Sequence, residues 1–358
     1  MRKVDKCMAK DNKVMDMEME FDFASLASDV FGEMTTTNKI STETKGMVIG
    51  LLGHNGTGKT TVASQLSDYT FVIPLERGAT AVSSKAQILK TRSYADFRKH
   101  VRTLTTNKKL LNILENTDKE IVVLVDGMEN LGLYATLYTQ DNFGVSDMSA
   151  VPHGKAWSFL KQLIHRDITQ LVSVGYTVIY TAHIKVDEEG YADFKESDRV
   201  VSPFRDVSDL VCLLVSNGQD ENGRTIKSSA YLTDSEQGFA RCRFPYVDPF
   251  IEEFTAENLK DTLRRGIQEQ IERDGLEEGT FKDTQALYSS NFDLSFDEAM
   301  DTIYKLLDEA DAKGLADEVD NILLNTLESV DALEKLTSRQ METVQTIHDD
   351  LKFFMENK

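Results

Sequence analysis

One stretch of the sequence has the residue types and spacing needed to bind phosphate. Residues 53–60 read Gly-His-Asn-Gly-Thr-Gly-Lys-Thr and fit the pattern G-x-x-x-x-G-K-[ST] at every fixed position. The glycines let backbone N–H groups curl around a phosphate, and the N-terminus of a following helix adds partial positive charge. A chance glycine-rich turn is the alternative, but an apolar run before the motif and a helical pattern after it favour a phosphate-binding loop. The residues expected to contact the phosphates or their metal are Gly53, His54, Asn55, Gly56, Thr57, Gly58, Lys59, Thr60 and Thr61.

A carboxylate follows a second apolar run. Residues 121–125 are Ile-Val-Val-Leu-Val, and Asp126 comes directly after them. A phosphate loop needs a carboxylate at the end of a neighbouring strand to hold the water shell of Mg²⁺. An aspartate after a strand is often only a turn former. Within the same strand and helix pattern, however, the sequence predicts that Thr60 and Asp126 hold the metal and that Lys59 reaches the β- and γ-phosphates.

Several classes of phosphate-loop protein do not fit the sequence. The Asn-Lys-x-Asp guanine motif of GTPases has its nearest match at Asn107-Lys108-Lys109-Leu110, which lacks the aspartate. The Leu-Ser-Gly-Gly-Gln signature of transporter ATPases is absent from the sequence. In the AAA+ class a glutamate normally follows the metal-binding aspartate, whereas Gly127 stands here. This departure argues against that class and implies that the attacking water is activated from elsewhere.

The motifs fall within a pattern typical of an α/β domain. Short Val- and Ile-rich runs without polar alternation are typical of buried parallel strands. Helical patterns separate them, and the clearest repeats apolar residues from Trp157 to Leu171 before Gly175. Two Asn-Gly turns, at 217–218 and 222–223, predict an antiparallel flank. The expected strands are residues 47–52, 70–75, 121–125, 177–181 and 210–215 in a mostly parallel sheet.

Composition limits the domain organisation and the environment. The 358 residues correspond to about two domains at roughly 150 residues each, and 41% are hydrophobic. The net charge of −20 is uneven, with −4 in residues 1–250 and −16 in residues 251–358. No apolar stretch is long enough for a membrane helix, and three cysteines without a C-x-x-C spacing fit a reducing cytoplasm. We therefore expect no membrane association and a cytoplasmic location.

Three regions are expected along the chain. Residues 1–44 are polar and Met-rich and are interpreted as an N-terminal arm. Residues 45–254 form the α/β domain. Residues 255–358 are acidic and helical, with capping boxes predicted at Ser295–Glu298 and Thr337–Gln340. The acidic region is interpreted as a unit for self-assembly or for contact with a protein partner.

Over residues 45–250 the sequence resembles RecA-like P-loop ATPases, and more narrowly the phage nucleotide-binding proteins related to short RecA-core single-strand-annealing ATPases. The resemblance is carried by the phosphate loop, by Leu75-Glu76-Arg77-Gly78, by Asp126 with the following Gly-Met-Glu-Asn-Leu, and by Thr181-Ala182-His183. It implies ATP hydrolysis with Mg²⁺, homo-oligomers and, often, action on single-stranded DNA. The N-terminal arm and the acidic region lie outside it.

The resemblance also implies roles for particular residues. Glu76 would orient the attacking water, although a loop carboxylate paired with Arg77 is the alternative. His183 would sense the γ-phosphate, although a packed histidine that ends a strand is the alternative. Glu129 is expected to lie in a turn that points away from the site, with Asn130 in a capping environment.

Further residues are candidates for contact with DNA or with a neighbouring subunit. The segments 140–153 and 184–203 would line a DNA path, with Lys195 and Arg199 as candidate contacts. The basic stretch 85–109 is either a solvated helix face or a DNA-facing patch. Residues that could reach a neighbouring subunit's ATP are Arg241 and Arg243, unless both are ordinary solvent-facing cations.

The function predicted from these observations is ATP binding and hydrolysis by a phage-type RecA-like protein in DNA recombination or replication, on single-stranded DNA. A nucleotide-switched adaptor such as a helicase loader is one alternative. A small-molecule P-loop kinase is another, although the sequence has no clear arginine-rich lid.

Overall fold

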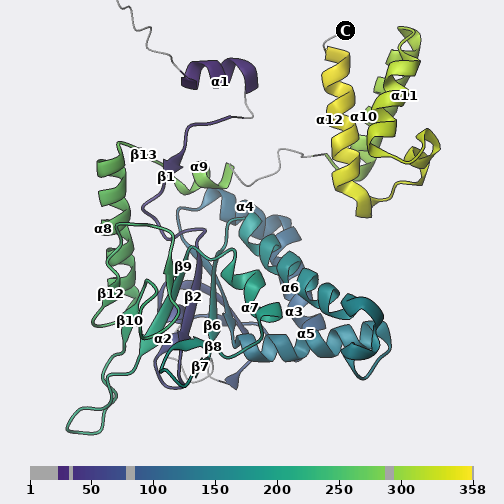
Figure 1. Cartoon of the computed structure of the whole chain (residues 1–358). Helices are drawn as coiled ribbons and strands as arrows, with labels where there is room; N and C mark the ends of the chain where they lie inside the picture. The colour runs from purple at the N-terminus through teal and green to yellow at the C-terminus, as the bar shows by residue number, and fades with distance from the viewer. Residues whose placement is uncertain (1–22, 32–34, 78–84, 287–293, 357–358) are drawn as a thin grey trace, which may run out of the picture. The chain divides into compact units, whose positions relative to one another are not determined.

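The computed structural model describes residues 23–31, 35–77, 85–286 and 294–356. The chain divides into two compact units, Met1–Leu287 and Tyr288–Lys358. The first is an α/β unit and the second is helical (Figure 1). Much of the expected N-terminal arm, and Gly78 after Arg77, lie outside the described residues. The described part of the arm contains α1 (Phe23–Phe31) and β1 (Lys39–Ile40).

The first unit is built on a nine-stranded sheet. Its path is β12-β10-β9-β2-β6-β5-β3-β4, and β11 pairs with β9. The five strands from β9 to β3 run parallel, and their Val-, Ile- and Leu-rich sequences are mostly buried, as expected under two layers of helices. The predicted α/β fold with a mostly parallel sheet is therefore confirmed. These strands are β2 (Val48–Gly53), β3 (Tyr69–Pro74), β5 (Ile121–Asp126), β6 (Thr177–Ala182) and β9 (Leu210–Val215).

Short strands extend the sheet at both edges. β4 (Gln87–Ile88) is parallel to β3. At the other edge, the antiparallel strands are β10 (Ser229–Tyr231), β11 (Arg241–Cys242) and β12 (Phe250–Ile251). Gly218 and Gly223, between β9 and β10, have φ values of +79° and +75°, which glycine adopts readily. The predicted antiparallel flank is confirmed.

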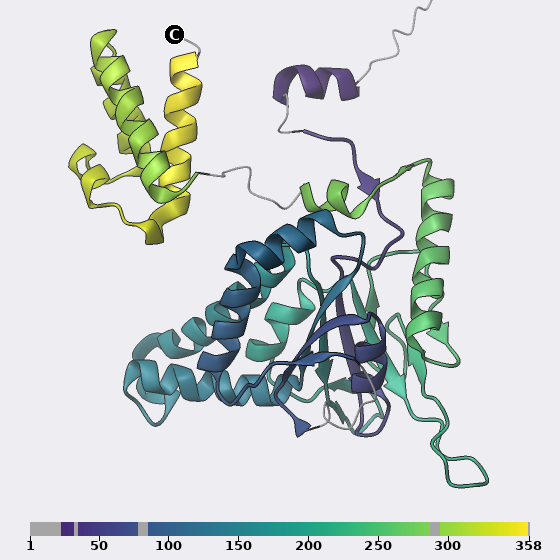
Figure 2. The same cartoon turned by 180° about the vertical axis from the view of Figure 1, so that it is seen from behind.

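Helices cover both faces of the sheet (Figures 1 and 2). Alternate residues of the strands belong to two separate hydrophobic cores, one on each face of the sheet. Val123 and Val125 face one layer of helices, and Val122 and Leu124 face the other. The first layer contains α3 (Tyr94–Thr106), α4 (Lys108–Asn116), α5 (Met128–Phe143), α6 (Lys155–Ser173) and α7 (Asp198–Arg205). The second contains α2 (Lys59–Gln65) and α8 (Ala256–Asp274). Connecting elements are η3 (Met148–Ala150), η4 (Pro152–Gly154), the hairpin β7 (Ile184–Val186) and β8 (Ala192–Phe194), β13 (Glu277–Glu278), which pairs with β1, and α9 (Phe281–Ala286).

The expected domain boundary at 254/255 differs from the division in the structure. Helix α8 begins at that boundary but packs its apolar face on the sheet, where Leu259, Leu263 and Ile267 are fully buried. β13 and α9 follow within the same unit, and the division falls at Leu287. The excess of acidic residues therefore begins within the first unit, on either side of a helix that packs on the sheet.

The second unit has a core of its own. Its helices are α10 (Phe296–Ala312), α11 (Ala316–Thr326), η5 (Val330–Lys335), η6 (Ser338–Gln340) and α12 (Met341–Glu356). Ile303, Leu323, Ile347 and Leu351 are buried among them. Both predicted capping boxes form, Ser295 with Glu298 and Thr337 with Gln340. Among the described residues of either unit, no helix is both long and apolar enough to cross a membrane.

Candidate active site

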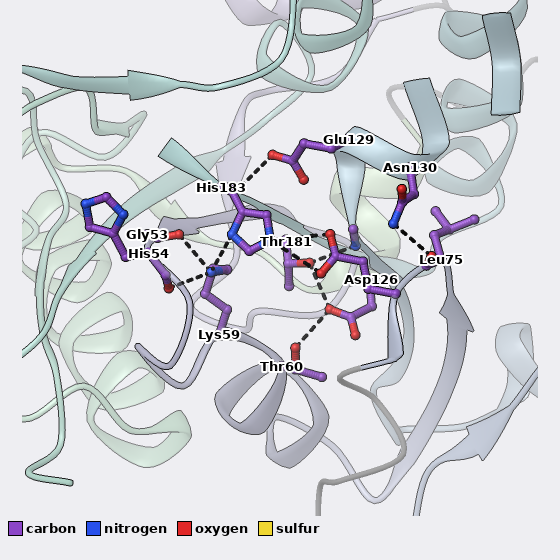
Figure 3. Close-up of polar contacts among 12 residues, drawn as sticks. Gly53, His54, Lys59, Thr60, Leu75, Asp126, Glu129, Asn130, Thr181 and His183 are labelled. Atoms are coloured by element: carbon purple, nitrogen blue, oxygen red, sulfur yellow. Dashed lines mark hydrogen bonds and ion pairs between the residues drawn. The ribbon is translucent and has the colours of Figure 1, made fainter. Parts of the chain in front are cut away.

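The phosphate loop lies at the carboxyl edge of the parallel strands, between the end of β2 and the start of α2 (Figure 3). Gly56 and Gly58 both have a φ of +82°, a conformation that strains other residues. Gly53 is required for a different reason, since a Cβ there would lie 2.8 Å from Thr57 Oγ1. The predicted strand, loop and helix are thus present. Residues 54–56 and Thr61 are exposed, whereas Thr57 is buried and donates to the His54 carbonyl.

Lys59 is held inside the loop. Its Nζ donates to the Gly53 carbonyl at 2.8 Å and to the His54 carbonyl at 2.9 Å, and it lies 3.4 Å from His183 Nδ1. The residue is 8% exposed, and this burial lowers the pKa of its ammonium group, opposed by nearby carboxylates. A buried cation facing a glycine-rich loop is suited to an anionic ligand that restores the lost solvation.

Asp126 ends β5 beside α2 and β6. Its Oδ1 accepts hydrogen bonds from Thr60 Oγ1 at 2.9 Å and from Thr181 Oγ1 at 2.8 Å. Its Oδ2 is buried and, among the described residues, has no hydrogen-bond partner. Burial raises the pKa of this carboxyl group, while the two threonine hydroxyls lower it. An orphaned carboxylate oxygen beside a threonine hydroxyl is a donor set that fits Mg²⁺.

Strand order brings His183 into the same site. β6 lies between β2 and β5, so the residue that follows its end sits between the phosphate loop and Asp126. His183 Nδ1 faces Lys59, and its Nε2 lies 3.3 Å from the carboxylate of Glu76. The imidazole therefore lies between the lysine of the loop, which is labelled beside it in Figure 3, and the carboxylate of Glu76.

Glu76 follows β3 and is oriented by the neighbouring strand. The backbone N–H groups of Leu75 and Glu76 both donate to the Asp126 carbonyl, at 2.9 and 3.2 Å. The Glu76 side chain then passes over Gly127, where an added Cβ would lie 2.5 Å from Glu76 Cγ. Asn130 secures the same corner by donating to the Leu75 carbonyl at 3.1 Å.

The expectation that Glu129 points away from the site is wrong. Gly127 allows α5 to begin directly after Asp126, and Glu129 lies in the first turn of that helix. Its Oε1 accepts the His183 backbone N–H at 2.7 Å, and its Oε2 is buried without a hydrogen-bond partner among the described residues. Single ligand atoms of Glu76, Glu129 and His183 all lie within 4.8 Å of one another.

Two further residues of the site were not predicted from the sequence. Thr181 both donates to Asp126 and accepts the Gly127 backbone N–H at 2.9 Å, so it fixes the corner that follows β5. Gly127 itself makes room for Glu76 at a φ of +109°. In the sequence, Thr181 is a polar residue near the end of a buried strand and belongs to the run Thr181-Ala182-His183, but its role depends on the register that pairs Asp126 with Thr181.

Arg241 and Arg243 lie at the opposite edge of the sheet. Arg241 of β11 pairs with Val211 near the amino end of β9, whereas Leu214 lies beside Gly53 of the phosphate loop. Arg241 Nη1 donates to the Arg205 carbonyl at 3.0 Å, and Arg243 Nη1 donates to Asp209 at 3.3 Å. Neither arginine approaches the site of its own chain, and a role toward a neighbouring subunit stays a prediction.

The segment 184–203 is a hairpin and a helix rather than an open loop. β7 and β8 pair antiparallel, and α7 follows. The Lys195 backbone N–H donates to the His183 carbonyl at 3.0 Å, which ties the base of the hairpin to the site. Lys195 is exposed, and Arg199 stacks over the Trp157 ring at 4.5 Å. Residues 184–199 carry six carboxylates and three Lys or Arg residues, so this surface is acidic.

Two known proteins are similar to this chain. A protein of Bacillus subtilis (strain 168), the SPbeta prophage-derived uncharacterized protein YorG, is 30% identical over 328 residues, which is 91% of this chain and 98% of that protein. The KaiC-like protein PH0186 of Pyrococcus horikoshii OT3 is 14% identical, with a TM-score of 0.31 over 53% of this chain and 80% of its own.

A protein-family model described as an AAA domain matches residues 45–244, the part of the chain that contains the sheet and the site. The sequence argument against an AAA assignment, made from Gly127, is therefore wrong at the level of the family. The coarser prediction of a P-loop ATPase domain with a phage relative is confirmed. The chain belongs to the AAA_24 family of AAA domains.

Proposed function

We propose that this protein binds ATP with Mg²⁺ and hydrolyses it. The observation that carries the proposal is the meeting of four segments at one sheet edge: the phosphate loop with Lys59, the end of β5 with Asp126, Glu76 after β3 and His183 after β6. A loop that only bound phosphate would need the first two. A carboxylate and an imidazole on the far side of the lysine are what a hydrolytic step needs in addition.

The chain's own contacts suggest how the phosphates are received. Lys59 is already desolvated and directed by two carbonyl oxygens, so little reorganisation is needed when the negative charge of the phosphates arrives. The backbone around Gly56 and Gly58 supplies N–H donors to the same charge. Lys59 then stabilises the charge that develops on the transferring phosphoryl group.

Thr60 and Asp126 are the residues that would hold Mg²⁺. When bound, the ion would neutralise negative charge that develops on the phosphate oxygens. Thr181 keeps Asp126 in place by occupying Oδ1, which leaves Oδ2 for the metal or its water shell. The raised pKa of Asp126 means that protonation competes with metal binding at a higher pH than for an exposed aspartate.

In this proposal Glu76 activates the attacking water. Its side chain is 29% exposed, so water can reach the carboxylate. The hydrogen bonds from the Leu75 and Glu76 N–H groups to the Asp126 carbonyl restrict where that carboxylate can lie. The carboxylate accepts a proton from the water as the water attacks the γ-phosphate. His183 lies between Glu76 and Lys59, and therefore at the place where the γ-phosphate charge is sensed.

The setting of this activity is proposed to be phage-type DNA recombination or replication on single-stranded DNA. Two observations support it: the resemblance to phage RecA-core ATPases and the prophage origin of a relative that matches over nearly the whole chain. Homo-oligomers, and contact of the acidic helical unit with a protein partner, belong to the same proposal. The hydrogen bond between the Lys195 N–H and the His183 carbonyl would couple the nucleotide site to the β7–β8 hairpin.

One assay separates the candidate functions. ATP turnover of the full chain is measured alone, with single-stranded DNA, with duplex DNA and with nucleoside monophosphates. The proposal expects Mg²⁺-dependent phosphate release that single-stranded DNA stimulates. Phosphoryl transfer to a monophosphate would identify a kinase, and ATP binding without turnover under any condition would identify a nucleotide-switched adaptor.

A further inference from the structure

A basic hollow lies in the helical layer of the first unit, away from the nucleotide site. It has a volume of about 630 Å³, and its walls come from α3, α5 and α6. α3 and α6 lie side by side on the same face of the sheet (Figure 2). Its lining has a net charge of +3 in a chain of net charge −20. The charged residues of the lining are Arg98, Lys99, Arg102, Arg166 and Asp167.

Two of the cations are fixed by a buried carboxylate. The Asp167 side chain is 3% exposed and lies 3.3 Å from Arg98 Nε and 3.5 Å from Arg166 Nε. Tyr94 donates to Asp167 at 3.0 Å, and Arg98 Nη1 donates to Tyr138 Oη at 2.9 Å. One negative charge thus holds two guanidinium groups on opposite walls and leaves an excess of positive charge.

The other two cations are free to bind a ligand. Within the described part of the chain, the side chains of Lys99 and Arg102 have no hydrogen bond or ion pair. Both are exposed on α3 and line the same hollow. Like charges gathered on a concave surface without counterions raise the local concentration of anions.

The basic surface continues beyond the first hollow. A second hollow of about 480 Å³ lies along α6 and shares Arg166 with the first. It adds Lys161 and His165 and contains no carboxylate in its lining. The two hollows together form a track rather than a single pocket, which suits an extended polyanion better than one isolated phosphate.

We propose that this track, the α3–α6 groove, binds the sugar-phosphate backbone of single-stranded nucleic acid. The inference rests on the proposed function for the choice of polyanion. It develops the DNA-facing alternative for the basic stretch 85–109, to which Arg98, Lys99 and Arg102 belong. It differs from the expectation that the segment 184–203 carries the DNA contacts, because residues 184–199 have a net charge of −3. Phosphate binding depends on Lys and Arg, so the groove is electrostatically favoured over the hairpin.

The test uses the full chain and a fluorescein-labelled oligothymidine strand, with binding followed by fluorescence anisotropy across a salt series. The double variant Lys99→Glu/Arg102→Glu is compared with Arg264→Glu/Arg265→Glu, which makes the same change in net charge on exposed residues of α8, in the other helical layer. A third variant, Lys195→Glu/Arg199→Glu, tests the hairpin. Thermal unfolding confirms that each variant is folded.

The groove variant is expected to bind at least about 10-fold more weakly at low salt. Losing two phosphate contacts should also flatten the slope of log K against log salt by about 1.4. The α8 variant should bind as the wild type does. Wild-type affinity in the groove variant, or loss only in the hairpin variant, would overturn the proposal, as would a wild-type chain that fails to bind the strand at low salt.

ATP turnover measured without DNA distinguishes failure of the groove proposal from failure of the proposed ATPase function. None of the substituted groove residues touches the nucleotide site, so basal turnover should be unchanged in the groove variant. Turnover that persists in a chain that binds no strand would reject the groove and retain the ATPase. Absence of turnover together with strand binding through the groove would reject the ATPase and retain the groove.

Discussion

Glu76 and Glu129 approach the same histidine in different ways. Glu76 faces the imidazole of His183 at 3.3 Å, whereas Glu129 accepts the backbone N–H of His183 at 2.7 Å. A residue that activates water must supply a basic carboxylate. A residue that positions a backbone needs only an acceptor oxygen. The two glutamates should therefore respond differently to the same substitution.

Glu76→Gln is expected to bind ATP normally and to hydrolyse it at least about 100-fold more slowly, the usual scale for losing a general base. The amide keeps the size of the side chain but cannot take a proton from water. Nucleotide affinity and single-turnover hydrolysis, measured on the same preparation, check this prediction. Unchanged turnover would mean that Glu76 only pairs with His183.

Glu129→Ala is expected to lower turnover about 10-fold, because the His183 N–H loses its acceptor and a misplaced group weakens catalysis. Glu129→Gln retains an amide oxygen for the same hydrogen bond and should stay within about threefold of the wild type. Steady-state turnover of the two variants checks the positioning role. A loss in Glu129→Gln as large as that in Glu76→Gln would make Glu129 the base.

At this scale, the sequence predicted the residues that belong to a contiguous motif. Lys59 and Thr60 are fixed within one loop, and Asp126 is recognisable because it ends an apolar strand. Glu129 and Thr181 were missed because their roles arise from pairing between β5 and β6, segments about fifty residues apart. Local patterns carry no information on that register.

At the scale of elements, long apolar runs were predicted and short strands were not. All five central strands have six residues and match the expected positions to within one residue at each end. The strands β7 and β8 have three residues each, Ile-Lys-Val and Ala-Asp-Phe, so the apolar alternation in each is too short to indicate a strand. Their pairing is set by contacts with the rest of the fold, such as that of the Ala192 carbonyl with Phe239.

The junction between β5 and α5 gives an element-scale prediction. Gly127→Ala should lower both the melting temperature and turnover, the latter by about 10-fold, because its Cβ would displace the carboxylate of Glu76. Gly144→Ala is a control for a positive φ without a collision: its φ is +63° and a Cβ there meets nothing within 4 Å. Strain alone should cost the control about 1 kcal/mol and leave turnover unchanged.

Thermal unfolding and turnover, measured for both glycine variants, separate strain from collision. If Gly127→Ala behaved like Gly144→Ala in both measurements, the close approach of Glu76 would not matter for catalysis.

At the scale of the whole molecule, charge alone placed the boundary too early. The excess of acidic residues begins near residue 251, yet 5 of the 16 excess negative charges belong to residues 251–287 of the first unit. Helix α8 is apolar towards the sheet and carries five carboxylates and four Lys or Arg residues, so most of this excess comes from Glu252, Glu253, Glu277 and Glu278 on either side of it. Composition averages the two faces of a helix, so it cannot tell a packed amphipathic helix from the start of a new domain.

Two truncations test where the units divide. A chain of residues 1–287 should remain folded and bind ATP, because the second unit has a separate hydrophobic core. A chain of residues 1–254 should aggregate or unfold, since it exposes the sheet residues that Leu259, Leu263 and Ile267 cover. Circular dichroism melts and nucleotide binding give the comparison. Equal stability of the two truncations would place the boundary at 254 after all.

The central claim is that the cluster around Lys59 hydrolyses ATP. The most direct measurement is Mg²⁺-dependent phosphate release by the full chain and by Lys59→Ala, with and without single-stranded DNA, each shown to be folded by its thermal melt. Removing the ammonium that faces the transferring phosphoryl group should abolish turnover, a loss of at least about 100-fold. Turnover near the wild-type rate in folded Lys59→Ala protein would contradict the assignment of this site as an ATPase.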